Sequence, residues 1–131
     1  MNLKTIMLSA VSAVAMTITS AAADAAENFL ILDILPLQEG QTIEAAETYF
    51  DAVEPIFARY GMTRSDAVLK VANVVRGKVD AQVVNLWQTE NPQASFDGIF
   101  SDEEYLTHTE SRDTIFNLQA ATIIVTERQE D

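Results

Sequence analysis

Residues 28–36 read NFLILDILP, an apolar run that a proline ends. Successive side chains of a strand point to opposite faces. One face of this segment carries Leu30, Leu32 and Ile34, and the other carries Phe29, Ile31, Asp33 and Leu35. Asp33 is therefore the single polar interruption of a strand that is apolar on both faces. Such a strand is typical of a sheet that is covered on both sides.

The segment after this strand has the periodicity of an amphipathic helix. Apolar and aromatic residues recur at steps of three and four from Ile43 to Tyr60, with charged residues between them. Thr42 can cap the start of this helix, and Gly61 can end it in a left-handed conformation. We therefore predict a helix over residues 43–60.

The remaining segments predict a hairpin, a second helix and a last strand. The stretches AVLKVANVV (67–75) and AQVVNLW (81–87) are rich in β-branched residues, and the intervening RGKVD contains Gly77. A loop with one turn follows, for which Asn91 and Pro92 provide a cap and a first helical residue. We predict the second helix from Ser101 to about Phe116 and the last strand within QAATIIVTERQ (119–129).

The resulting order is βαββαβ, which is typical of the ferredoxin-like α+β fold. In this fold two helices cover one face of an antiparallel sheet. The other face should then alternate with polar residues if water covered it, but the first and last strands are apolar or β-branched on both sides. The same face of a second subunit is the simplest cover, so we predict a homodimer.

The N-terminus has the pattern of a cleaved export signal over residues 1–25. Lys4 precedes the apolar run TIMLSAVSAVAMTIT, and the small residues SAAADA end in an A-x-A cleavage pattern. The apolar run is shorter than the roughly 20 residues that span a bilayer, so a membrane anchor is disfavoured. We expect a single mature domain over residues 26–131, periplasmic or secreted, with no membrane association after cleavage. The chain contains no cysteine, so packing alone must stabilise it.

The charge balance excludes one class of partner. Twenty acidic and eight basic residues give a formal net charge of −12, and the basic residues are scattered. Binding to a phosphate backbone requires clustered Lys and Arg. We therefore expect no nucleic-acid partner and interpret the acidity as a contribution to solubility.

The stretch SDEEYLTHTESRD (101–113) contains the candidate catalytic residues Tyr105, His108 and Arg112. Ser101 and Glu104 have the spacing of a capping box. On one continuous helix, Tyr105 and Arg112 would point inward, and His108 would flank them.

Two interpretations of this stretch remain open. In the structural one, a carboxylate pairs with a buried Arg112, and His108 lies half-solvated at the helix margin. In the functional one, Arg112 holds an anionic ligand and His108 acts as an acid or base near neutral pH.

Three further residues are candidates for ligand binding together with Arg112. Asn85 and Trp87 share a face of a predicted buried strand, where an amide needs hydrogen-bond partners. Asp33 interrupts the first strand in the same way. The structural alternatives are that Trp87 belongs to the core and that Asp33 pairs with a buried Arg or Lys. We expect no metal site and no cofactor, because phosphate-loop and metal-binding spacings are absent from the sequence and one histidine does not indicate haem ligation.

With these motifs in view, residues 28–128 resemble the family catalogued as domain of unknown function 1330, of the dimeric α/β-barrel superfamily. The resemblance lies in AVEPIFARYGM (52–62), VVNLW (83–87) and SDEEYLTHTESRD. This chain departs from the family by its export signal, its lengthened connection over 89–100, and a single glycine at position 61 where a pair is expected.

The resemblance implies a homodimer whose two sheets face each other, and it implies no established reaction. Relatives in the superfamily include cofactor-free monooxygenases, lactone isomerases and haem enzymes, so the fold does not select among small-molecule roles. Tyr105 and Arg112 match positions of the motif without a known role. Two hypotheses follow: an exported dimer that binds a small molecule, or a cofactor-independent enzyme of monooxygenase or isomerase type.

Overall fold

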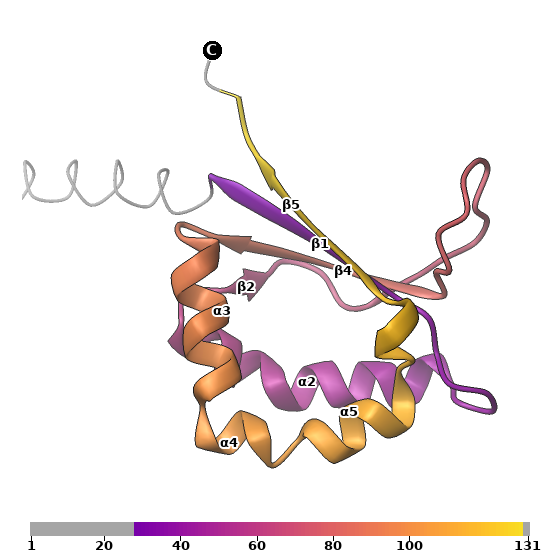
Figure 1. The fold of residues 1–131 in the computed structure, drawn as a ribbon, viewed down its shortest axis with the longest axis horizontal. Coiled ribbons are helices and arrows are strands. Elements are labelled where there is room, and N and C mark those ends of the chain that lie inside the picture. Colours follow the sequence, from indigo (N-terminus) through magenta and orange to yellow (C-terminus); the bar gives the residue numbers. More distant parts are fainter. Residues whose placement is uncertain (1–27, 130–131) are drawn as a thin grey trace, which may run out of the picture.

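The computed structural model describes residues 28–129. Residues 1–27 and 130–131, and with them the expected signal and its cleavage site, lie outside the described residues. The described chain forms one antiparallel sheet with the strand order β2-β4-β1-β5, and β3 also pairs with β4 (Figure 1). The strands are β1 (Phe29–Leu35), β2 (Thr63–Arg64), β3 (Leu69–Lys70), β4 (Val83–Thr89) and β5 (Thr122–Glu127).

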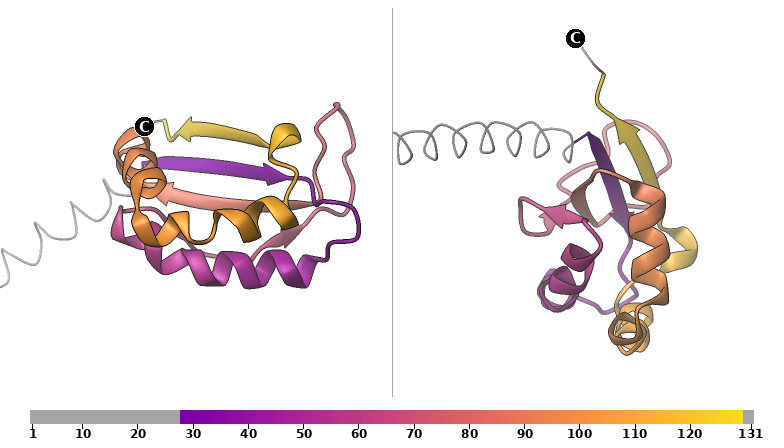
Figure 2. Two further views of the ribbon diagram at one scale, coloured as in Figure 1. Left: turned by 60° about the horizontal axis from the view of Figure 1, so that its bottom comes forward. Right: turned by 90° about the vertical axis from the view of Figure 1, so that its left-hand side faces the viewer.

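All helices lie on one side of this sheet, as two views of the ribbon show (Figure 2). They are α2 (Ile43–Arg59), α3 (Pro92–Ser101), α4 (Glu103–Leu106), α5 (Thr109–Ile115) and a 3-10 turn, η1 (Leu118–Ala120). The prediction of a ferredoxin-like α+β fold is confirmed. The predicted helix over 43–60 is confirmed too: the Thr42 side chain accepts a hydrogen bond from the Ala45 N–H at 3.1 Å, and Gly61 follows the helix with a φ of 78°.

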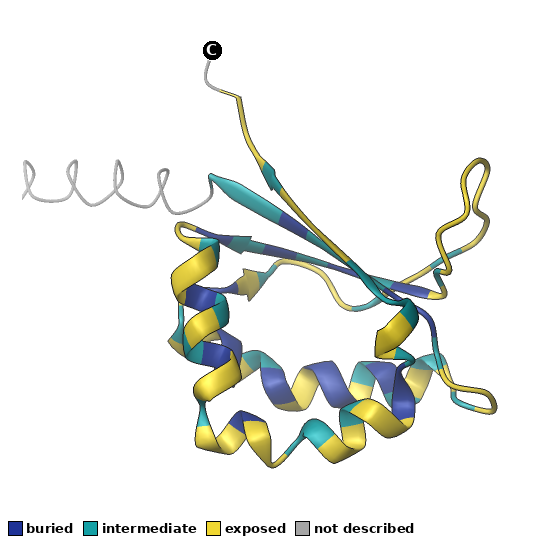
Figure 3. Ribbon diagram, in the orientation of Figure 1, coloured by how far each residue is buried: buried dark blue, intermediate teal, exposed yellow. Residues whose placement is uncertain are grey.

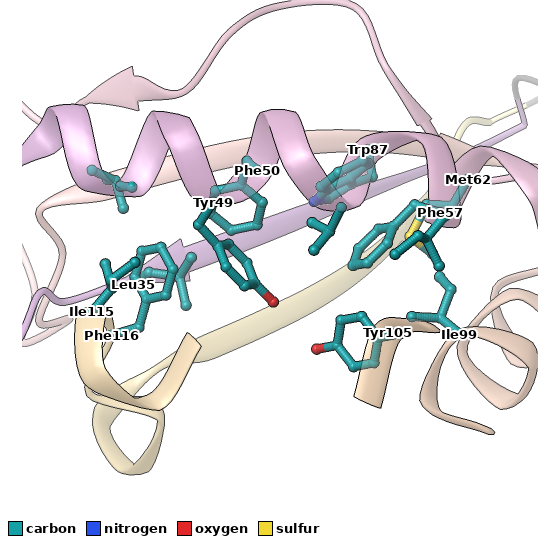
Figure 4. Packing of buried hydrophobic residues seen from close by; sticks show 14 of the residues in the cluster. Leu35, Tyr49, Phe50, Phe57, Met62, Trp87, Ile99, Tyr105, Ile115 and Phe116 are labelled. Carbon is teal, nitrogen blue, oxygen red and sulfur yellow. The ribbon is translucent and has the colours of Figure 1, made fainter. Parts of the chain in front are cut away.

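The core lies between α2 and the inner, helix-facing side of the sheet (Figure 4). Its centre is aromatic: the rings of Phe57 and Trp87 lie 4.6 Å apart, and those of Phe50 and Phe116 lie 5.3 Å apart. Inner residues of β4 such as Val83 and Trp87 are almost completely buried. Strand alternation and the helical period thus bring the predicted apolar residues to one interior.

The expected hairpin is much shorter than its sequence suggests. Only Leu69 and Lys70 of the stretch 67–75 pair with β4, and residues 71–82 form a loop that projects beyond the sheet (Figure 1). The register explains the difference, because Val83 already lies opposite Leu35, the last residue of β1. Within residues 28–129, no other strand pairs with the segment before Val83, so the valines of the projecting loop have no neighbouring strand to pack against. Val75 is 90% exposed.

The second helix is also not continuous, and Ser101 does not cap it. Asn91 and Pro92 start α3 as expected, but α3 runs to Ser101 itself, and Asp102 caps α4 by accepting the Tyr105 N–H at 2.8 Å. Hydrogen bonds from the Tyr60 hydroxyl, the Tyr105 backbone and Arg59 hold the pKa of Asp102 at about 2. These contacts fix an extended residue between the two helices, and a further break at Thr107 and His108 separates α4 from α5.

The outer face of the sheet, which is the face away from the helices, carries apolar and uncharged polar residues, and Figure 3 shows that the strands are not uniformly buried. Its apolar side chains are Leu30, Leu32, Ile34, Leu69, Val84, Leu86 and Ile124. None of them is fully buried, and Ile124 is 44% exposed. No charged residue occupies a paired strand position on this face within the described chain. No helix among residues 28–129 has the length and apolar character needed to cross a membrane.

Candidate functional site

A cavity of about 140 Å³ lies between the inner side of the sheet and the helices. Aromatic and aliphatic side chains form most of its wall, including those of Ile31, Phe50, Phe57, Trp87, Phe100 and Phe116. Four polar side chains interrupt this wall: Asp33, Tyr49, Tyr105 and Arg112. An apolar cavity with a few polar groups is the usual form of a small-molecule site.

Asp33 reaches the cavity from the middle of β1. Its neighbours across the sheet are Asn85 and Ile123, and its carboxylate accepts one hydrogen bond, from the Trp87 indole N–H at 3.4 Å. Among residues 28–129 no basic side chain forms an ion pair with it. The pairing with a buried Arg or Lys considered above is therefore not observed. Burial raises the pKa of Asp33 to about 6, and the hydrogen bond from Trp87 opposes this only in part.

Two phenols line the cavity from the helices, opposite the strand that carries Asp33. Tyr49 comes from α2 and Tyr105 from α4, and their hydroxyl groups point toward one another (Figure 4). Burial, with a further contribution from Tyr105, raises the pKa of Tyr49. The Tyr49 hydroxyl therefore stays protonated throughout the physiological range.

Arg112 stands behind Tyr105 rather than in a buried ion pair. Its Nη1 donates to the Tyr105 hydroxyl oxygen at 3.0 Å, and its Nε donates to the carboxylate of Asp113 at 2.9 Å. The Arg112 side chain is 23% exposed. The structure thus brings Tyr105 and Arg112 together at the cavity, although they belong to two separate short helices.

His108 is not part of this arrangement. It is the residue before α5, in the turn after α4, and it is half-buried. It does not line the cavity. The only histidine of the chain therefore lies apart from the polar groups that do.

The fully buried arginine of the described chain is Arg64, which the sequence analysis missed. Its side chain is 2% exposed and binds the carboxylates of Asp51 at 2.9 Å and Glu54 at 3.2 Å. Its guanidinium carbon also lies 5.8 Å from the ring centroids of two adjacent aromatic residues, Phe50 and Trp87. The spacing of the two carboxylates on one helix face was visible in the sequence, but their proximity to Arg64 depends on how β2 packs.

This arginine also decides the position of Asn85, a predicted ligand-binding residue. The amide oxygen of Asn85 accepts a hydrogen bond from Arg64 Nη1 at 3.0 Å, and Asn85 does not line the cavity. Its buried amide nitrogen has no hydrogen-bond partner among residues 28–129. Of the four predicted ligand-binding residues, Asp33, Trp87 and Arg112 lie at the cavity, while Asn85 belongs to the Arg64 cluster.

Comparison with known proteins identifies the fold and no family. No family model and no curated protein sequence matches the chain. Among solved structures, a protein of unknown function from Rhodopseudomonas palustris is 17% identical, with a TM-score of 0.59, over 80% of this chain and 85% of that one. The protein PA3566 from Pseudomonas aeruginosa is 12% identical, with a TM-score of 0.56, over 81% of this chain and 98% of that one.

A third solved structure has a described activity. SnoaB, a cofactor-independent oxygenase from Streptomyces nogalater, is 11% identical, with a TM-score of 0.53, over 81% of this chain and 97% of that one. Likeness at this level of identity shows a shared fold, and folds of this kind support many different functions.

Proposed function

We propose that the protein is an exported homodimer that binds a small, largely apolar ring compound in the cavity between its sheet and helices. The observation that carries the proposal is the composition of the cavity wall. Many apolar and aromatic side chains surround a few polar groups that could orient a bound molecule.

The size of the cavity sets the size of the ligand. Its volume of about 140 Å³ is close to that of an engineered cavity of about 150 Å³ in another protein, which binds benzene. A single six-membered ring therefore fits. The Asp33 carboxylate and the phenols would select among such rings those that carry a hydroxyl or carbonyl group.

The single tryptophan allows this binding to be measured directly. Trp87 lines the cavity, so a bound ring should change its fluorescence in a saturable way. The probes are phenol, benzyl alcohol and cyclohexanone, with glucose as a non-binding control. Ile31→Phe fills the cavity and should abolish the response, whereas Val75→Phe on the projecting loop should leave it unchanged. Failure of every ring compound to bind at millimolar concentration, or full binding by Ile31→Phe, would contradict the proposal.

The second subunit is proposed to cover the outer face of the sheet. Leu32 lies between Leu86 and Ile124 on the neighbouring strands, so apolar side chains run across three strands without a charge. Because the chain carries a net charge of −12, two copies repel each other over most of their surface. The uncharged outer face is where this repulsion opposes association least, and isologous packing of two such faces would bury both.

Light scattering after size exclusion should give twice the mass of the mature chain at micromolar concentration. Leu32→Asp should convert the protein to a monomer, because it places a charge in the centre of the apolar face. Val75→Asp introduces the same charge on the projecting loop and should remain dimeric. A parent protein that elutes as a monomer would rule out the dimer while leaving the cavity proposal intact.

A second candidate function is a cofactor-independent enzyme that uses the same cavity. One observation favours it: Asp33 has a pKa of about 6 and no ion-pair partner among residues 28–129, which is the state of a carboxylate suited to accept a proton near neutral pH. The fold shared with a cofactor-independent oxygenase is compatible with this candidate. Turnover of a bound ring compound without any added cofactor would separate it from simple binding.

A further inference from the structure

We propose that the cavity enolises small cyclic ketones, with Asp33 removing the proton beside the carbonyl group and Tyr49 and Tyr105 holding the carbonyl oxygen. This inference rests on the proposed binding of a small ring in the cavity and specifies the chemistry there. It follows from the distribution of polar groups around the apolar wall. The sheet contributes a hydrogen-bond acceptor, Asp33 of β1, and the helices contribute donors, Tyr49 of α2 and Tyr105 of α4.

The acceptor side consists of the Asp33 carboxylate. Its Oδ2 accepts the Trp87 indole N–H at 3.4 Å, and within the described chain Oδ1 accepts no hydrogen bond. The carboxylate lines the cavity amid apolar side chains. A carboxylate in such surroundings, with one weak hydrogen bond and no cation, gains from taking up a proton.

The donor side consists of the two phenols backed by Arg112. The Tyr105 oxygen already accepts a hydrogen bond from Arg112 Nη1 at 3.0 Å, so its own proton is free to be donated elsewhere. A hydroxyl that accepts from a cation is polarised and becomes a stronger donor. Tyr49 of α2 points its hydroxyl toward that of Tyr105 (Figure 4), and, besides burial, the hydrogen bond between the two phenols is one cause of the raised pKa of Tyr49. The guanidinium therefore acts on the cavity through Tyr105, as a positioning residue.

A ketone placed between the two sides can lose a proton without any cofactor. The C–H bond next to the carbonyl breaks, the proton moves to the Asp33 carboxylate, and the electron pair moves onto the carbonyl oxygen. Hydrogen bonds from the phenols stabilise the resulting enolate. Return of the proton from Asp33 to the same carbon regenerates the ketone, and return to a conjugated carbon gives an isomer. No electrons enter or leave, so no oxidant is needed.

The combination of residues suits this reaction for a general reason. Enolisation needs a base of moderate strength and a neutral donor at the oxygen, and an aspartate with a tyrosine is an established pair for the purpose. The raised pKa of Tyr49 keeps that phenol neutral, and the pKa of Asp33 lies near the working pH.

Proton exchange with solvent tests the inference on the intact protein. In deuterated buffer, NMR should show that the parent protein accelerates loss of the protons next to the carbonyl of cyclohexanone, cyclopentanone or cyclohex-2-enone. Asp33→Asn should reduce the acceleration by about 100-fold or more, as removal of a general base does. Tyr105→Phe should also reduce it by about 100-fold, as loss of an oxyanion donor does. His108 lies outside the cavity, so in the presence of His108→Gln the ketone protons should exchange at the same rate as with the parent protein.

Trp87 fluorescence, recorded on the same samples, separates this inference from the proposed binding. If a ketone binds the parent protein without accelerated exchange, or if Asp33→Asn exchanges as fast as the parent, enolisation is wrong and binding stands. Binding of phenol without binding of any ketone also overturns enolisation alone. If none of the rings binds, the proposed function itself fails.

Discussion

Replacement of Arg64 by alanine should lower the free energy of unfolding by about 3 kcal/mol, as breaking a buried charge pair does. The Arg64 side chain is 2% exposed, and its loss also removes the donor to the oxygen of the buried Asn85 side-chain amide, whose nitrogen has no partner among residues 28–129. The carboxylates of Asp51 and Glu54 are more exposed and remain hydrated, which keeps the loss near the lower end for such pairs. Urea unfolding at fixed protein concentration measures the change.

Arg59 provides the matched control. It forms ion pairs with Asp102 and Glu104, each at 3.0 Å, but its side chain is 49% exposed. Water screens such pairs, so Arg59→Ala should destabilise the protein far less than Arg64→Ala. Equal losses for the two variants would mean that the Arg64 cluster is open to water in solution.

Replacement of Asp33 by asparagine should instead raise the free energy of unfolding, by an amount that depends on pH. The pKa of Asp33 rises from 3.8 to about 6 in the folded protein, so the folded state favours the protonated form. The stability associated with this group is complete below about pH 4 and is lost as the pH rises through 6. At pH 7 the parent therefore contains a disfavoured charge that Asp33→Asn removes. We expect a gain of about 2 kcal/mol at pH 7, allowing for partial exposure, and almost none at pH 4.

The groups around Asp33 support this sign. Burial raises the pKa of Tyr49 of α2, which therefore stays neutral at these pH values, and Arg112 of α5 is engaged with Tyr105 and Asp113. The neighbouring strands β4 and β5 present Trp87 and Ile123, neither of which titrates. Unfolding curves of parent and variant from pH 4 to 8 measure the difference. Asp66→Asn, at an exposed turn, is the control and should show no such gain; a parent more stable than Asp33→Asn at pH 7 would refute the argument.

Local periodicity predicted the main elements of the fold because the same residues that set the period are those that become buried. The alternation in 29–35 and 83–87 and the three-to-four spacing of α2 describe faces that the structure indeed buries. The predicted strand over 67–75 failed for a nonlocal reason, since the sheet ends opposite Leu35. The continuous helix from Ser101 failed because α3 occupies the residues before Asp102.

The sequence predicted residues of the candidate site only where a polar residue interrupts an apolar segment or where the spacing of polar residues is distinctive. Asp33 could be found as a polar residue in an apolar strand, and Tyr105 with Arg112 could be found by their spacing. Tyr49 gave no such signal, because a tyrosine on the buried face of a helix is ordinary core. The cavity itself depends on how β1, β4 and β5 pack against the helices, and no short stretch of sequence contains that information.

Backbone hydrogen bonds close the projecting loop over residues 71–82 at its base, where it joins the sheet. The Val71 N–H donates to the Gln82 carbonyl at 2.9 Å, and the Gln82 N–H donates to the Leu35 carbonyl at 3.0 Å. These hydrogen bonds hold the two ends of the loop side by side, whatever the conformation of its tip. The entropic cost of closing a loop rises only slowly with its length. The stability of the fold should therefore depend little on the number of residues at the tip. None of its residues lines the cavity, so this loop is the natural place to insert an affinity tag or a fluorescent label.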